Sequence, residues 1–105
     1  MNIHQIVLLG RATRDSEELT SKDEKKYAKF CIAVNDFNGK TKEEKTTFYD
    51  VLVFGNSVDS AVEKVKKGDP VMVMGRPEAE AFISKKDNEP KVSITVVSES
   101  WKVIK

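Results

Sequence analysis

Aromatic side chains on a polar strand face are the feature of this sequence that points to chemistry. The stretch Thr46–Gly55 is rich in Val, Tyr, Phe and Thr and ends at a glycine, which predicts a β-strand. Because side chains alternate across a strand, Phe48, Asp50 and Phe54 share one face, with the two rings roughly 20 Å apart. A carboxylate between two rings predicts a face open to water. Rings so placed could stack unpaired nucleotide bases; the alternative is that a loop or a second subunit covers them.

A second aromatic site is predicted at a turn. Phe37 lies beside Asn38-Gly39, which is a strong hairpin-turn signal. Three lysines follow the ring: Lys40, Lys42 and Lys45. A ring next to three cations suits a flap over a polyanion. The alternative is a turn that Phe37 anchors on the protein surface, with lysines that serve solubility.

Groups suited to catalysis or metal binding are sparse. His4 is the only histidine and begins a strand, so an imidazole-based triad is not supported. The single Cys31 excludes an internal disulfide and a cysteine-based zinc site, and its position within a strand predicts an inert thiol. Gly39-Lys40-Thr41 lacks the upstream glycine of a phosphate-binding loop, because Val34 stands there. The acidic runs lack the spacing of a calcium loop. We therefore predict a binding protein, not an enzyme, with no metal and no cofactor.

Composition predicts one soluble domain spanning residues 1–105. The chain has 105 residues, of which 33% are charged and 39% hydrophobic. Its 18 lysines and arginines nearly balance 17 acidic residues, so attraction to nucleic acid must come from the distribution of charge. The apolar run near the N-terminus is too short for a signal peptide, and no segment is long enough to span a membrane. The expected compartment is the cytoplasm, bacterial or that of a phage host.

Five strands and one helix are expected to position the aromatic residues. The predicted strands are Ile3–Ala12, Tyr27–Asn35, Thr46–Gly55, Pro70–Ser84 and Lys91–Val97. The helix, Asn56–Lys67, has apolar residues at helical spacing and Asn56 or Ser57 as its side-chain cap. The connections Thr13–Lys26, Asp36–Lys45 and Lys85–Pro90 are expected to be loops. A helix between the third and fourth of five strands is the layout of an OB-fold, an all-β, five-stranded Greek-key barrel.

Two details of the strands extend this expectation. Gly10 and the Gly75-Arg76-Pro77 segment predict bends or bulges of the kind that turn the corners of a barrel. The run Ile6–Leu9 is apolar on both faces, so one face is expected to join the core and the other to meet a neighbouring subunit. Beyond the Gly75 bend, alternation predicts that Phe82 shares a charged face with Glu78 and Glu80.

Five segments, in order, resemble the bacterial-type single-stranded DNA-binding proteins, an OB-fold family of bacteria, phages and organelles. The matching segments are Ile6–Arg11 with Arg14-Asp15, Phe30–Asn35, Phe48–Gly55, Val65–Val71 and Met74–Arg76. The aromatic-led Phe48–Gly55 is the most specific of them. The resemblance runs from Ile3 to about Val97, which is essentially the whole chain.

The resemblance implies non-catalytic, largely sequence-independent binding and protection of single-stranded DNA in replication, recombination or repair. Family positions for base stacking fall on Phe37 (within one residue), Phe48, Phe54 and Phe82. The residues expected to meet phosphates are Arg11, Lys40, Lys42, Lys45, Lys66, Lys67, Lys85 and Lys86. Stacking is worth about 1–3 kcal/mol per base, and phenylalanine, which offers a smaller face than the tryptophan common in the family, is expected at the lower end. The family also implies a homo-oligomer, a homotetramer built from dimers or a dimer.

The sequence departs from the family pattern where charge matters. Glu78 and Glu80 stand where relatives often have arginine. Asp50 replaces a common arginine and Gln5 a common lysine, so weaker binding and a shallower salt dependence are expected. The sequence also ends at Lys105 without the acidic tail by which bacterial members recruit replication and repair proteins. Either that tail was removed or this member lacks it, as would suit a phage or plasmid version.

The sequence is also compatible with two other functions. An OB-fold can act as a protein-interaction or primosome-type assembly subunit that binds nucleic acid weakly, and the acidic residues on the expected binding face favour that function. Stacking on aromatic rings does not distinguish RNA, with its 2′-hydroxyl, from DNA, so single-stranded RNA is a possible ligand.

Overall fold

The computed structural model describes residues 5–104, except for the side chain of Lys91. Its strands are β1 (Ile6–Ala12), β2 (Glu17–Thr20), β3 (Lys26–Asn38), β4 (Glu43–Phe54), β5 (Pro70–Ile83) and β6 (Pro90–Val103). A 3-10 turn, η1 (Gly55–Ser57), and one helix, α1 (Val58–Lys64), join β4 to β5. The predicted start of the first strand at Ile3, and His4, lie outside the described residues.

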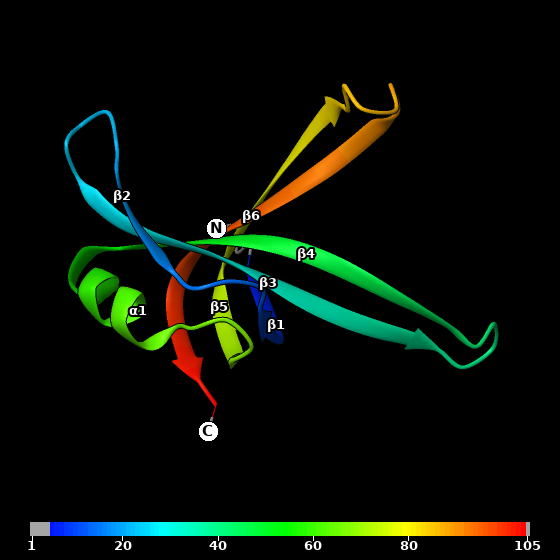
Figure 1. Ribbon diagram of the computed structural model, residues 1–105, viewed down its shortest axis with the longest axis horizontal. Coiled ribbons are helices and arrows are strands. Elements are labelled where there is room, and N and C mark those ends of the chain that lie inside the picture. Colours follow the sequence, from blue (N-terminus) through cyan, green and yellow to red (C-terminus); the bar gives the residue numbers. More distant parts are fainter. Residues whose placement is uncertain (1–4, 105) are drawn as a thin grey trace.

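The strands close into a five-stranded barrel with α1 beside one end (Figure 1). The order around the barrel is β1-β5-β6-β4-β3, and β3 then meets β1 again. β1 pairs with β5 from Ile6 to Arg11 but reaches β3 only through Arg11 and Ala12. β4 and β6 run parallel, and the other pairs are antiparallel. The predicted all-β barrel, with one helix between its third and fourth strands, is confirmed.

The predicted loop Thr13–Lys26 is wrong in part, because it contains β2. This strand pairs antiparallel with the start of β3, from Glu17 opposite Lys29 to Thr20 opposite Lys26. Only Leu19 within it is partly buried. An edge strand of this kind is held by main-chain hydrogen bonds and needs no apolar alternation, so its sequence resembles a solvated loop.

The helix is shorter than predicted. It begins at Val58 and ends at Lys64, and Val65 already has an extended backbone. Ser57 precedes the helix but makes no side-chain capping hydrogen bond, so it does not act as the predicted cap. A 3-10 turn occupies the position where the predicted helix began. Gly68, with φ of +89°, adopts the left-handed conformation that glycine tolerates best.

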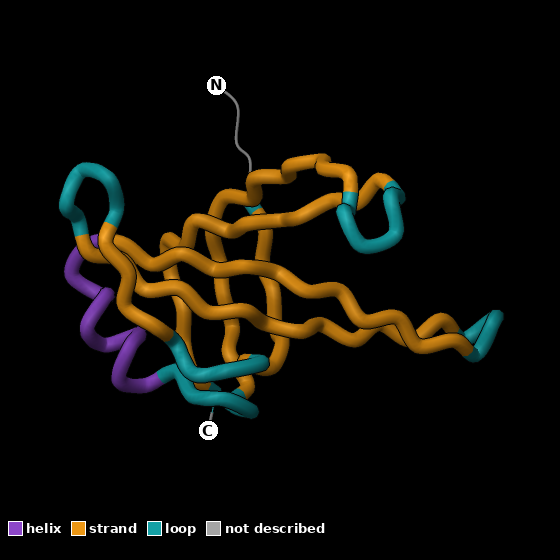
Figure 2. The backbone as a smooth tube through the Cα atoms, turned by 45° about the horizontal axis from the view of Figure 1, so that its top comes forward, coloured by secondary structure: helices purple, strands orange, loops and turns teal. Residues whose placement is uncertain are grey.

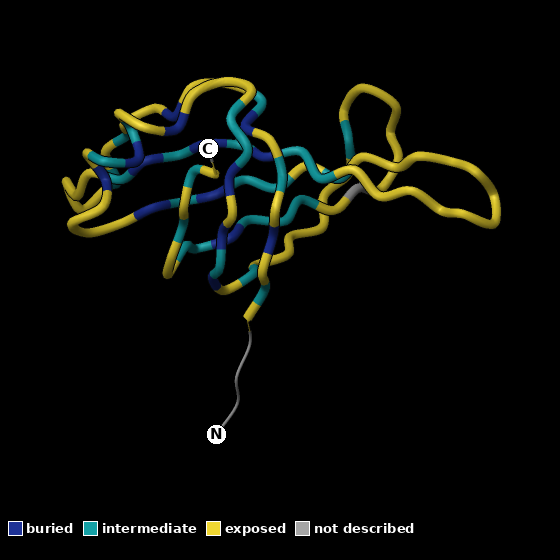
Figure 3. Tube along the Cα trace, turned by 90° about the horizontal axis from the view of Figure 1, so that it is seen from below, coloured by how far each residue is buried: buried dark blue, intermediate teal, exposed yellow. Residues whose placement is uncertain are grey.

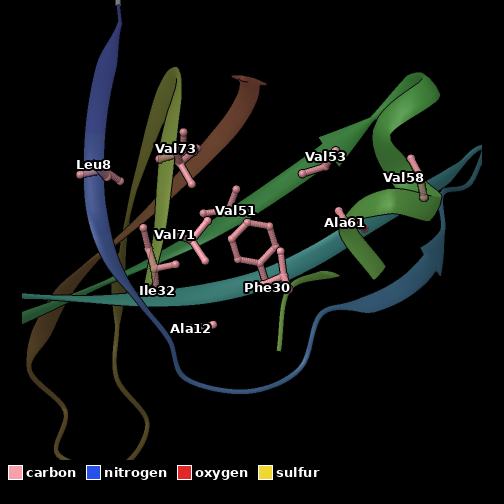
Figure 4. Close-up of a cluster of buried hydrophobic side chains, with 13 residues drawn as sticks. Leu8, Ala12, Phe30, Ile32, Val51, Val53, Val58, Ala61, Val71 and Val73 are labelled. Carbon is pink, nitrogen blue, oxygen red and sulfur yellow. The ribbon is translucent and has the colours of Figure 1, made fainter. Parts of the chain in front are cut away.

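The core fills the barrel and continues under α1. In Figure 4, Phe30 and Ile32 of β3 point toward Val51 of β4, while Val58 and Ala61 project from the helix. The alternation predicted for β3 and β4 is therefore confirmed at these positions. The buried hydrophobic residues are Leu8, Ala12, Ala28, Phe30, Ile32, Val51, Val53, Val58, Ala61, Val65, Val71, Val73 and Val96.

The bulge predicted near Gly75 is confirmed, and the backbone approaches another strand closely at both Gly75 and Gly10. The register of β5 with β6 shifts between Met74 and Gly75, which leaves Glu99 as the extra residue on β6. A Cβ at Gly75 would clash with the carbonyl oxygen of Val97. At Gly10, where β1 approaches β3, a Cβ would lie 2.6 Å from the carbonyl oxygen of Ala33.

Two hairpins extend beyond the barrel as arms (Figure 2). The β3–β4 arm comprises residues 35–46 and the β5–β6 arm residues 78–93. The β3–β4 ladder continues to Asn38 opposite Glu43, so much of the predicted loop Asp36–Lys45 is strand. The last strand likewise runs past Val97 to Val103. Buried residues gather in the barrel and the arms are almost wholly exposed (Figure 3).

Candidate nucleic-acid interface

Strand register assigns all four predicted stacking phenylalanines to one outer face of the sheet. Partners across a ladder point to the same side, and side chains alternate along each strand. One row of partners crosses four strands: Lys29 of β3, Leu52 of β4, Val97 of β6 and Arg76 of β5. The next row is Cys31, Asp50, Thr95 and Glu78. Counting in steps of two along the strands reaches Phe48 and Phe54 on β4, Phe37 on β3 and Phe82 on β5.

All four rings are open to solvent. The exposed fractions are 68% for Phe37, 61% for Phe48, 45% for Phe54 and 47% for Phe82. Phe37 lies on the β3–β4 arm and Phe82 on the β5–β6 arm, whereas Phe54 ends β4 beside α1 (Figure 1). No loop within residues 5–104 covers them. The outer face therefore presents aromatic surface from the helix end of the barrel out to both arms.

Tyr27 is a fifth aromatic residue of this face that sequence reasoning did not include. It lies opposite Phe54 in the β3–β4 ladder. The two ring centroids are 5.3 Å apart with an interplanar angle of 27°, which is a stacked pair. Because Tyr27 begins the predicted second strand and Phe54 ends the third, hairpin register was the signal that could have found the pair.

The predicted basic residues of the arms lie at or near the two tips. Lys40 and Lys42 belong to the turn of the β3–β4 arm, where their backbone N–H groups donate to Asn38. Lys85 and Lys86 belong to the turn of the β5–β6 arm. Lys45 of β4 is opposite Asp36 of β3. By alternation, the Lys45 side chain points away from the face that carries Phe48. All five lysines are exposed.

Arg11 connects the aromatic face to the remaining predicted cations. It is opposite Ala33 in the β1–β3 ladder, and Ala33 is opposite Phe48, so the three residues form one row. Its guanidinium Nη1 donates to the carbonyl oxygen of Gly68 at 3.0 Å. Lys66 and Lys67 precede that glycine in the loop after α1, and both are exposed. The structure thus places these two lysines next to Arg11, one strand beyond the aromatic face rather than on it.

Acidic side chains interrupt the face. Asp50 and Glu78 flank Thr95 in one row across β4, β6 and β5. Glu80 lies two residues further along β5, between Glu78 and Phe82 on the same side. Carboxylates at these positions repel phosphates, so the face offers aromatic surface with little net positive charge.

Other kinds of site find no support in the described part of the chain. Residues 5–104 hold no group of three or more His, Cys, Asp or Glu side chains placed to bind a metal ion. Cys31 is a free, partly exposed thiol on the outer face. Between residues 5 and 104 there is no helix with the length and apolar character needed to cross a bilayer.

The chain matches the model of the Single-strand binding protein family over residues 3–104. Single-stranded DNA-binding protein 1 of Streptococcus agalactiae is 27% identical over 103 residues, covering 97% of this chain and 63% of that protein. The single-stranded DNA-binding protein of Streptococcus pneumoniae is 29% identical over 106 residues, covering 97% and 65%. That of Borreliella burgdorferi is 31% identical over 99 residues, covering 90% and 66%. The chain thus spans slightly less than two thirds of the length of these relatives.

A solved structure shows the same fold. The crystal structure of a small single-stranded DNA-binding protein from Streptomyces coelicolor superimposes with a TM-score of 0.79 at 18% identity, covering 99% of this chain and 96% of that one. The resemblance inferred from five sequence segments is confirmed by these matches. The chain belongs to the single-strand binding protein family, which is a family of binding proteins and not of enzymes, as the sequence predicted.

Proposed function

We propose that this chain binds single-stranded DNA, largely without regard to sequence, and protects it during replication, recombination or repair in the cytoplasm. The observation that carries the proposal is the shared outer face of Phe37, Phe48, Phe54 and Phe82, all exposed. Every base has a π-face, so a row of rings accepts any sequence, and stacking contributes about 1–3 kcal/mol per base. A duplex keeps its bases stacked on one another and cannot use these rings.

Cations along the edges of the face would hold the phosphates. Some lie at the two arm tips, whereas Arg11 lies where β1 pairs with β3, in the row of Ala33 and Phe48. A strand that crosses the rings can therefore meet a cation as it arrives and as it leaves. Asp50, Glu78 and Glu80 reduce the number of favourable phosphate contacts, so the affinity should depend less on salt than for a more basic face.

The same chain is proposed to assemble as a homo-oligomer, a homotetramer or a dimer, through β1. Val7 and Leu9 are exposed at 63% and 61%, and Met72 lies opposite Leu9 on the same side. The second edge of β1 pairs with β3 only at Arg11 and Ala12, so Ile6–Leu9 present a strand edge open to another chain. An apolar strand with an open edge is a surface that soluble proteins cover.

A second candidate function is a protein-interaction or primosome-type assembly subunit. The acidic row of Asp50 and Glu78 favours it, because a mixed-charge face with exposed rings also suits a basic protein partner.

A fluorescence-polarisation titration separates these functions. Labelled oligo-dT, the matching duplex and an oligo-rU of equal length are each titrated with the full chain at low salt. Micromolar or tighter binding to dT with much weaker duplex binding supports the proposal. An absence of dT binding favours the assembly subunit, and equal binding of rU extends the ligand to single-stranded RNA.

A further inference from the structure

The turn at the end of the β3–β4 arm joins an asparagine to a glycine. Asn38 is the last residue of β3 and Gly39 begins the turn, away from the barrel (Figure 2). Both residues are exposed, and a Cβ added at Gly39 would meet nothing within 4 Å. Asn38 is the only asparagine of the chain that precedes a glycine. Because glycine has no side chain, its backbone nitrogen can approach the preceding side chain without obstruction.

Two backbone donors hold the side-chain carbonyl of Asn38. The Lys40 N–H donates to Asn38 Oδ1 at 3.0 Å, and the Thr41 N–H donates to the same atom at 3.4 Å. Within residues 5–104, neither Asn38 Nδ2 nor the Gly39 N–H donates a hydrogen bond. Donors on Oδ1 stabilise the negative charge that this oxygen acquires when a nucleophile adds to Cγ, as the donors of an oxyanion hole do.

Positive charge and water both reach this turn. Lys40 and Lys42 belong to it, and both are exposed. Their ammonium groups favour an anion on the turn, although salt screens the effect. A hollow of ≈ 500 Å³ lies beside the turn, and Asn38, Gly39 and Glu43 are among the residues that line it. Water can therefore reach the Asn38 side chain.

We propose that Asn38 is a site of spontaneous deamidation, through which the tip of the β3–β4 arm acquires a carboxylate as the protein ages. The Gly39 backbone nitrogen loses its proton to hydroxide and bonds to Asn38 Cγ. The bond from Cγ to Nδ2 then breaks, and Nδ2 takes a proton from water and leaves as ammonia, which restores the hydroxide. Water opens the resulting five-membered imide to aspartate or isoaspartate. The net reaction consumes water, releases ammonia and needs no oxidant or reductant.

The other asparagines of the described residues lack this combination. Asn35 lies within the β3–β4 ladder opposite Thr46, whose hydroxyl donates to Asn35 Oδ1 at 2.6 Å. Asn56 and Asn88 are exposed, but each is followed by a residue with a side chain, which obstructs attack by the next backbone nitrogen. These three residues are therefore reference positions within the same molecule.

A carboxylate at position 38 would lie beside Phe37 and the lysines of the turn. Its effect on binding rests on the proposed function. The carboxylate offsets one cation at the arm tip and so removes the equivalent of one phosphate contact. Binding of single-stranded DNA should weaken, and the slope of log K against log salt should become shallower by about 0.7.

Peptide mass spectrometry of aged protein tests the modification. The full chain is kept at neutral and at mildly alkaline pH and sampled over several weeks. We expect Asn38 to become aspartate and isoaspartate, faster at the higher pH because more of the Gly39 amide is ionised. Gly39→Ala, which the open turn accommodates, is expected to slow the reaction several-fold. Persistence of Asn38 for as long as Asn88, or an equal rate in Gly39→Ala, would overturn the proposal.

The same measurement on unfolded protein tests the contribution of the turn. The two donors to Asn38 Oδ1 are fixed in place only in the folded arm. The native chain is therefore expected to react no more slowly than the chain unfolded in urea. A much slower native reaction would show that the turn protects Asn38, which contradicts the proposal.

Oligo-dT titrations distinguish the modification from the proposed function. N38D supplies the aspartate product directly, and aged Gly39→Ala is the control that retains its asparagine. We expect N38D and aged wild type to bind more weakly than fresh wild type, and aged Gly39→Ala to bind like fresh wild type. If fresh wild type does not bind oligo-dT, the proposed function fails, whereas the mass spectra still decide the modification. If N38D binds like fresh wild type, the effect on binding is overturned.

Discussion

Asp15 and Lys67, which lie 52 residues apart in the chain, are joined by a hydrogen bond of 2.8 Å in which the Lys67 backbone N–H donates to Asp15 Oδ1. Beside it, the Ser16 N–H donates to the Val65 carbonyl oxygen at 3.0 Å and the Gly68 N–H to that of Ala12 at 2.8 Å. The segment after β1 therefore clamps the loop that follows α1. Asp15, the acidic residue of the Gly-Arg…Asp pattern, thus holds Lys67 near Arg11 of the same pattern.

Removing the Asp15 carboxylate should loosen this clamp. We expect Asp15→Ala to lower the free energy of unfolding by about 1 kcal/mol, because a backbone donor loses a charged acceptor but remains accessible to water. Urea denaturation measures the change. Asp23→Ala, in the exposed β2–β3 turn, is the matched control and should leave the midpoint where it was; equal effects would mean that the hydrogen bond contributes nothing specific.

A methyl group at Gly75 should destabilise the barrel at its bulge. The added Cβ would meet the Val97 backbone, which cannot move without disturbing the β5–β6 ladder. We expect Gly75→Ala to cost about 1–3 kcal/mol, as overpacking usually does, and to lower the melting temperature accordingly. At Gly39 there is open space within 4 Å and no positive φ. Gly39→Ala should therefore melt like the wild type, and a Gly75→Ala protein that did so too would contradict the bulge geometry.

Stacking on the β5–β6 arm should be specific to one of its faces. Phe82 and Ile83 are adjacent, both exposed, and point to opposite sides of the arm. Phe82→Ala is expected to weaken oligo-dT binding by about 1 kcal/mol, roughly fivefold, since a phenylalanine ring gives the lower end of stacking energies. Ile83→Ala is expected to leave the affinity unchanged. Similar losses in both variants would assign the arm a role other than stacking.

Reversing a charge on the acidic row should strengthen binding. Glu78→Lys removes a carboxylate next to Thr95 on the outer face and supplies a new cation. We expect tighter oligo-dT binding and a salt slope steeper by about 0.7 for each additional phosphate that the lysine neutralises. The control is Glu63→Lys on α1, an exposed position with the same change in net charge. An equal increase in affinity at Glu63 would show that net charge, and not its place on the face, governs binding.

A charge on the outer side of β1 should prevent self-association. Leu9→Lys places an ammonium group where the proposed interface is apolar, and burying it without a partner is costly. Light scattering is expected to report a larger particle for the wild type and a monomer for the variant. Val92→Lys on the β5–β6 arm, another exposed apolar strand position, should keep the wild-type mass. A monomeric wild-type chain would contradict the interface itself.

Much of the barrel was predictable because its strands alternate over a single core. Period-two spacing of apolar residues predicts the buried faces that carry Phe30, Ile32 and Val51. The bulge was predictable because Gly75, which has no side chain, allows close approach of the backbone. β2 was not predictable in this way, because main-chain pairing with β3 holds it and its side chains carry no pattern. The length of the β3–β4 arm was hidden for a related reason: beyond Asn35 the ladder continues where no core requires apolar residues.

The sequence predicts which candidate-site residues share a face within one strand, but not how the strands lie relative to one another. Phe48 and Phe54 share a strand, so alternation alone put them on one face. Their relation to Phe82 depends on β6 lying between β4 and β5, which is a matter of topology that no local pattern reports. The stack of Tyr27 on Phe54 depends on the register of the β3–β4 hairpin, which sets the first residue of one strand opposite the last residue of the other.

The pairing of β1 with β5 has a consequence for how the chain reaches its native state. The β3–β4 and β5–β6 hairpins bring together residues close in sequence and can form early, whereas Ile6 must find Gly75 across most of the chain. Such non-local pairing is slow, because the entropy of closing the intervening loop is lost before the contact forms. During synthesis β1 is made before the other described strands, yet its Ile6–Leu9 run must stay unpaired until β5 has emerged. This apolar run is therefore exposed to aggregation until its partner strand is available.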